Sequence, residues 1–143
     1  MRFVFALALV AACSGAQPKP HGEPALAKKL SLSWGFTPVP DNKEMTDVFL
    51  ATTDETARQI SHPVGRYKGK CAAVKPDPSM KAIIGARCET SPGNGTELHA
   101  VSRPDEVVVL QMGLTAGAKP DPMAREPVTT IKVPLGITVD ASP

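Results

Sequence analysis

Aromatic side chains and long hydrophobic runs are scarce in this chain of 143 residues. It has four phenylalanines, one tyrosine and one tryptophan, and Phe3 and Phe5 both lie at the extreme N-terminus. Binding sites for single-stranded bases usually need several aromatic side chains on one surface, so this composition argues against a stacking platform. The longest apolar run, 3–12, has ten residues, whereas a membrane-spanning helix needs about 20.

A strong charge of either sign is also missing, because 16 basic side chains face 14 acidic ones. Nucleic-acid-binding domains concentrate basic residues on one surface, so we expect no nucleic acid partner. The sequence has no phosphate-binding glycine loop, no serine-hydrolase elbow and no histidine pair at metal-ligand spacing. We interpret His21, His62 and His99 as surface or half-buried structural residues. The sequence therefore predicts no catalytic residues, no metal site and no cofactor.

The N-terminus has the features of an export signal. Arg2 precedes the apolar run, which ends in Val10, Ala11, Ala12 and Cys13. This string resembles the lipobox of bacterial lipoprotein signal peptides, in which an aliphatic residue and two small residues precede an acylated cysteine. The resemblance implies that residues 1–12 are removed and that Cys13 carries lipid. It also implies a protein anchored in the bacterial cell envelope, with the outer membrane favoured over the inner.

An ordinary secretory signal is the alternative. Small residues at 14–16 fit a cleavage site that would leave Gln17 as the first mature residue. The protein would then be soluble in the periplasm or secreted. In either case residues 13–29 are small, polar and rich in proline, which predicts a flexible tether before a folded domain over 30–143.

The domain over 30–143 alternates apolar and polar residues in short segments, with proline, glycine and asparagine between them. This alternation predicts strands with one buried face, and the separators predict turns. We expect a hairpin around 104–105, a loop over 115–127, and either a turn or a short helix over 54–60. The fold class is therefore all-β, an antiparallel sandwich or barrel of about seven strands. The expected strands are 30–36, 47–52, 67–74, 81–90, 96–102, 107–114 and 128–139, the last divided by Pro134.

Three cysteines are present, and lipid on Cys13 would leave Cys71 and Cys88 as a pair. An oxidising envelope would let these two form a disulfide. The alternative is two free thiols, with Lys68 and Lys70 lowering the pKa of Cys71. Free thiols would suit a small periplasmic thiol enzyme or redox protein.

Basic residues gather between 58 and 87, where seven lysines and arginines accompany one acidic residue. Arg66, Lys68 and Lys70 alternate along the strand expected over 67–74 and its approach, so they would share one face. Such a face could contact anionic lipid headgroups or an anionic envelope polymer. The alternative is a solvated strand face that acidic residues elsewhere balance.

These patterns together predict a lipid-anchored cell-envelope protein with a binding or structural role and no catalysis. The expected partner is another envelope protein or an anionic envelope polymer. The basic strand face and the loop over 115–127 are the candidate contacts, since long loops on rigid scaffolds often carry function. A thiol enzyme and a periplasmic metal-binding lipoprotein remain as alternatives.

Overall fold

The computed structural model describes residues 28–119, 121 and 124–142. The predicted signal peptide, the lipidation site Cys13 and nearly all of the tether lie outside the described residues. Within the described part there are nine strands and one short 3-10 helix, Pro78–Met80, and no helix there is long and apolar enough to cross a membrane. The strands are β1 (Lys29–Val39), β2 (Asn42–Asp54), β3 (Gln59–Lys68), β4 (Lys70–Val74), β5 (Ala82–Ser91), β6 (Asn94–Arg103), β7 (Glu106–Leu114), β8 (Glu126–Lys132) and β9 (Thr138–Ala141).

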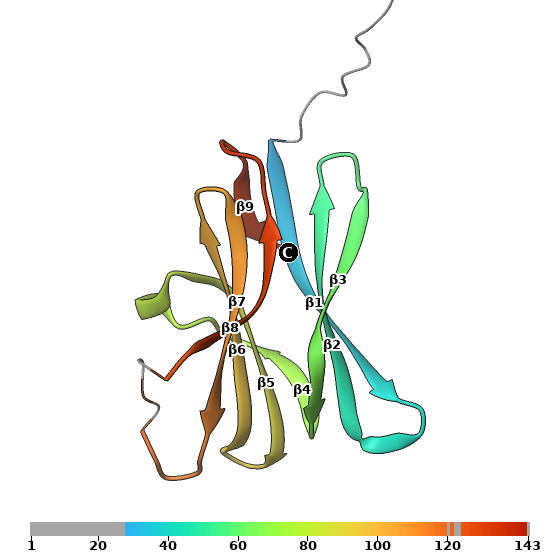
Figure 1. Cartoon of the computed structure of the whole chain (residues 1–143), viewed down its shortest axis with the longest axis vertical. Helices are drawn as coiled ribbons and strands as arrows, with labels where there is room; N and C mark the ends of the chain where they lie inside the picture. Colours follow the sequence, from blue (N-terminus) through green and yellow to red (C-terminus); the bar gives the residue numbers. More distant parts are fainter. Residues whose placement is uncertain (1–27, 120, 122–123, 143) are drawn as a thin grey trace, which may run out of the picture.

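The strands form two sheets that face each other (Figure 1). The first sheet has the order β3-β2-β1-β9, and the second has the order β4-β5-β6-β7-β8. The predicted all-β class is confirmed, and the architecture is a sandwich. Neighbouring strands are antiparallel except β1 and β9, which run parallel over 29–32 and Thr138–Ala141.

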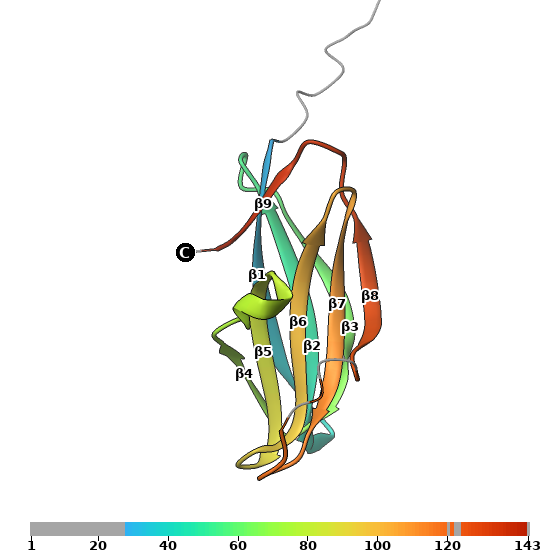
Figure 2. The same ribbon diagram turned by 90° about the vertical axis from the view of Figure 1, so that its left-hand side faces the viewer.

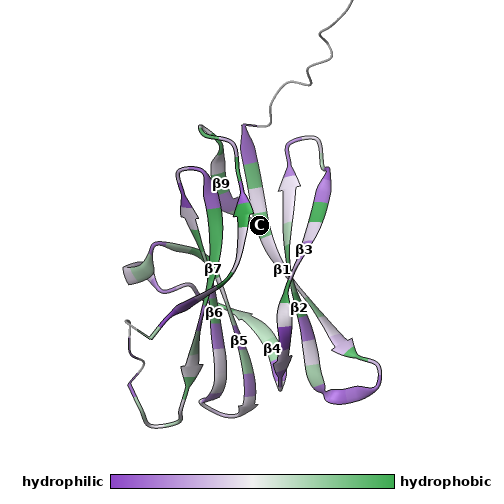
Figure 3. Cartoon of the chain, in the orientation of Figure 1, coloured by the Kyte–Doolittle hydropathy of each residue, from purple (hydrophilic) through white to green (hydrophobic). Residues whose placement is uncertain are grey.

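The core lies between the inner faces of the two sheets. Leu32 and Leu50 from the first sheet meet Leu98 and Val109 from the second, and all four are fully buried. Burial of one such side chain stabilises the fold by roughly 1.5–3 kcal/mol. Figure 3 shows apolar colouring along β7. Val108 of β7 points away from the core yet is only 2% exposed, so the outer face of the second sheet is covered too.

The single strand expected over 67–74 is wrong. Lys68 ends β3 in the first sheet, whereas Lys70 begins β4 in the second sheet. Gly69 lies between them with a φ of 102°, and a Cβ there would be 2.3 Å from the carbonyl oxygen of Glu89. Only glycine fits this crossing from one sheet to the other.

The segment over 54–60 resolves as a turn rather than a helix. The Asp54 carboxylate accepts hydrogen bonds from the N–H groups of Thr56 at 2.8 Å and Arg58 at 3.1 Å. Aspartate favours turns because its side chain bonds the backbone locally. The chain then returns as β3, a strand that the sequence pattern missed because Pro63 interrupts it. Proline is tolerated there because β3 is an edge strand.

The last expected strand, 128–139, is two strands in different sheets. β8 pairs with β7, whereas β9 pairs with β1, and Pro134 lies in the segment that crosses between the sheets. The predicted hairpin around 104–105 is confirmed, because Arg103 and Glu106 are opposite each other at its end.

Candidate functional site

The predicted disulfide is present. Cys71 and Cys88 are directly opposite each other on β4 and β5, and their sulfur atoms are 1.98 Å apart. Cys88 is fully buried in the core. The bond fastens the short edge strand β4 to β5 and occupies both sulfur atoms, so a thiol reaction would first require its reduction.

Arg66 lies on β3 and forms a two-point ion pair with Asp47 on β2. Its Nε is 2.7 Å from Oδ1 and its Nη2 is 3.1 Å from Oδ2. These hydrogen bonds lower the pKa of Asp47 and raise the pKa of Arg66. Because a carboxylate neutralises the guanidinium locally, Arg66 presents little net positive charge to an anionic partner.

Lys68 and Lys70 lie on different strands, so the three predicted basic residues do not share one strand face. The Lys68 Nζ is 4.0 Å from Glu44 Oε1, and Lys70 is paired across the strands with Glu89. Both lysines line an open pocket of about 360 Å³, together with Lys43 and the carboxylates of Glu44 and Glu89. This arrangement favours the balanced-surface alternative, and contact with an anionic polymer stays a prediction.

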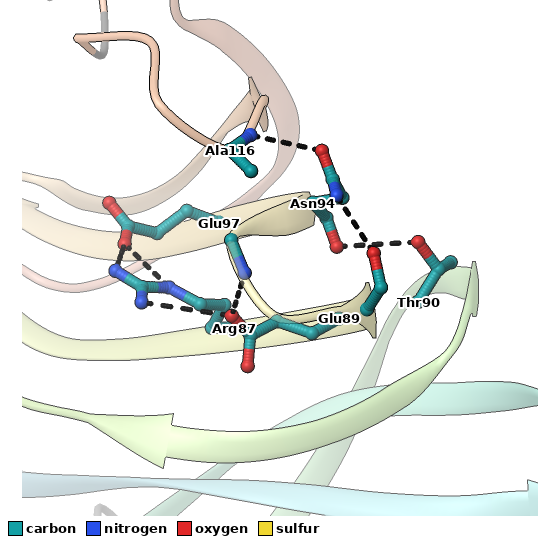
Figure 4. Close-up of polar contacts among 8 residues, drawn as sticks. Arg87, Glu89, Thr90, Asn94, Glu97 and Ala116 are labelled. Carbon is teal, nitrogen blue, oxygen red and sulfur yellow. Dashed lines mark hydrogen bonds and ion pairs between the residues drawn. The ribbon is translucent and has the colours of Figure 1, made fainter.

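Glu97 and His99 form a buried polar pair that sequence reasoning did not identify. They are two residues apart on β6 and point to the outer face of the second sheet, where they are 8% and 2% exposed. His99 Nε2 is 3.5 Å from Glu97 Oε1. Figure 4 shows the other side of Glu97, where its Oε2 accepts a 2.6 Å hydrogen bond from Arg87 Nη2. Burial lowers the pKa of His99, and the charge of Glu97 partly opposes this shift.

Two chain segments lie over this pair and explain its burial. The connection from β4 to β5 passes in front of β5 in Figure 2, and its Asp77 is 3.7 Å from Arg125, which precedes β8. Pro76 also lies close to Gly85, the residue opposite His99. Because the imidazole is almost completely covered, the arrangement suits the fixing of these segments better than acid–base chemistry on a substrate.

The loop over 115–127 is held at its start by Asn94. The Asn94 Oδ1 accepts a 3.0 Å hydrogen bond from the N–H of Ala116, and its Nδ2 donates to Ser91 Oγ at 2.8 Å (Figure 4). Residues 120 and 122–123 lie outside the described residues, and β8 begins at Glu126. The role of this loop as a contact stays a prediction.

An apolar groove opens between β1 of the first sheet and the β4–β5 edge of the second. Its lining includes Trp34 and Phe36 of β1 and Val74 and Ile83 of the second sheet, and its volume is about 350 Å³. The Trp34 Nε1 is buried and has no hydrogen-bond partner among the described residues. Leu32, Trp34 and Phe36 alternate along β1 and share one face of the strand. Nothing in this alternation indicates that Leu32 is fully buried whereas Trp34 and Phe36 are only partly buried.

Half of β1 has an unpaired edge beside this groove. β9 pairs with β1 only over 29–32, and the Ser142 N–H then donates to the Leu32 carbonyl at 2.9 Å. From 33 to 39, β1 pairs with β2 alone among the described strands. Ala141 and Ser142, which follow this pairing, also line the groove.

The described residues contain no group of three or more His, Cys, Asp or Glu side chains placed to hold a metal ion. No protein-family model, curated protein or solved structure matches this chain.

Proposed function

We propose that this protein is a lipid-anchored component of the bacterial cell envelope whose β domain binds another envelope protein without catalysing a reaction. Lipid on Cys13 would hold the protein in the membrane, the outer rather than the inner, and the chain between Cys13 and β1 would act as the tether. The lipobox-like sequence supports the anchor. The Cys71–Cys88 disulfide supports an oxidising compartment, since such bonds persist outside the cytosol.

The groove between the sheets is the observation that carries the binding role. Ligand and partner sites are usually concave and apolar, with few polar groups. Trp34 and Phe36 are partly buried and contribute large apolar side chains to the lining of the groove, and tryptophan is enriched at the energetic centres of interfaces. The carboxylates beside Arg66 and Lys68 make a polyanion the weaker candidate partner.

Photo-crosslinking in an expressing Gram-negative host tests this function. A benzophenone amino acid in place of Ala73, an exposed residue of the groove wall, should give one defined adduct with an envelope protein. The matched control is the same substitution at Thr130, an exposed residue of β8 in the same sheet, and it should give none. Equal adducts at both positions, or no adduct from position 73 in folded protein, would overturn the binding role.

The intact mass of the membrane-bound protein tests the anchor separately. A diacyl or triacyl increment on Cys13 is the expected result. A soluble species that begins at Gln17 and carries no lipid would contradict it.

A further inference from the structure

Resting on the binding role proposed above, we infer that the groove and the open edge of β1 together take an extended segment of the partner protein. This segment adds to the first sheet as a further strand beside residues 33–39. The backbone of the partner bonds the edge of β1, and its alternate side chains enter the groove.

The register of β1 shows which backbone groups face the open edge. The Leu32 carbonyl accepts the Ser142 N–H on that side, and backbone groups of a strand alternate in direction with period two. The N–H and C=O groups of Trp34 and Phe36 therefore face the same open edge. No described strand pairs with them there. Pro38, the next residue in phase, has no N–H and limits the edge to two donors.

The other half of the same edge already holds a strand of this kind. β9 is a four-residue extended segment that lies parallel to β1 and buries Val139, which is 8% exposed, between the sheets. An occupant of 33–39 would continue this ladder. A lipid chain or a sugar could fill the apolar groove but would leave the row of backbone groups on β1 without a matching row of partners.

The remaining sheet edges are protected against such pairing. β3 carries Pro63 and a register shift, and β8 carries Pro127 beside another register shift. β4 is five residues long and begins with Lys70, and β9, the other edge strand of the first sheet, has only four residues. Short edges, prolines, bulges and lysines are the usual devices that prevent strand addition. The open part of β1 has none of these devices except Pro38 near its end, so this part of β1 is the accessible edge.

The pleat also defines the partner sequence. Side chains that are paired with Trp34 and Phe36 lie on the same face of the sheet and would point into the groove. A segment along 33–39 spans roughly 20 Å at about 3.3 Å per residue. The partner segment should therefore be extended and apolar at alternate positions, with polar residues between them.

Two variants at Phe36 separate backbone bonding from aromatic contact. Phe36→Ala and Phe36→Pro both remove the ring, but only the proline removes the N–H that faces the open edge. With the photo-crosslinker at position 73, the alanine variant measures the effect of losing the ring, and the proline variant should give at least about tenfold less adduct than the alanine variant. Equal adducts in the two variants would overturn strand addition and leave the binding role standing. If neither variant nor the protein with Phe36 in place gives an adduct, the binding role itself is wrong.

Amide exchange in the unsubstituted protein provides a measurement that does not depend on the folding of a variant. The probe is a synthetic peptide that corresponds to 137–142, the segment of this chain that already occupies the other half of the edge. Saturating peptide should slow exchange of the Trp34 and Phe36 amides about tenfold and leave the Thr130 amide unchanged. Unchanged exchange at both β1 amides would refute the inference. If protection of these amides grows with protein concentration without peptide, and sedimentation gives a doubled mass, the edge binds a second copy of this chain. That result would also refute the inference.

Discussion

Reduction of the Cys71–Cys88 bond should lower the free energy of unfolding by a substantial amount. The two cysteines are 17 residues apart in sequence, and the loop between them contains most of β4, the connection to β5 and most of β5 itself. In the chain-entropy view, closing a loop of this length restricts the unfolded chain by about 3 kcal/mol. Edge strand β4 pairs with β5 alone in its sheet, so the lost restriction acts on a strand with few other backbone bonds.

Urea unfolding of the oxidised and the reduced protein measures this effect. Reduced protein keeps both sulfur atoms in the core, so the difference in midpoint reports the cross-link with little change in packing. The double variant Cys71→Ala, Cys88→Ala is the matched control, and it should be slightly less stable than reduced protein because Cys88 is fully buried. A midpoint that does not move on reduction, with the same slope, would refute the reasoning.

Three further predictions concern single side chains. Burial lowers the pKa of His99, so on acidification the unfolded state takes up a proton before the folded state does. The free energy of unfolding should therefore be at its full value above about pH 6.5 and fall below that pH by up to about 1.4 kcal/mol per pH unit. An equally steep fall in the His99→Gln variant would contradict this prediction. Gly69→Ala should cost about 3 kcal/mol, because the new Cβ would meet the Glu89 carbonyl at a positive φ, and an unchanged melting temperature would refute it. Tyr67→Phe removes the 3.0 Å hydrogen bond from the Tyr67 hydroxyl to Gln111 and should cost about 1 kcal/mol in urea unfolding, whereas a stabilised variant would show that the bond contributes nothing.

The sequence predicted those elements whose signals are local. The strands expected over 96–102 and 107–114 correspond to β6 and β7, and the turn residues between them located their hairpin. The pairing of Cys71 with Cys88 followed from the cysteine count and the expected compartment. Each of these inferences needed only neighbouring residues or a count.

The sequence failed where distant segments decide the outcome. β3 was missed because Pro63 weakens a strand pattern, and only its position at the sheet edge makes proline acceptable. His99 was expected at or near the surface because nothing in its own strand shows that the 75–81 connection and Arg125 lie over it. The groove was missed for the same reason, since the exposure of Trp34 depends on how far β9 extends along β1.

One chain segment, the connection from β4 to β5, contributes both to the wall of the groove and to the cover over His99. Pro76 forms part of the groove wall, and the next residue, Asp77, is the one that meets Arg125 over His99. The Asp77 side chain is 41% exposed, so its ion pair with Arg125 is a modest support and the disulfide is the stronger one. The connection from β4 to β5 is held by the disulfide at β4 and by the ion pair of Asp77 with Arg125. A wall fixed in this way keeps the groove open without a bound partner, which reduces the conformational entropy that an incoming strand must overcome.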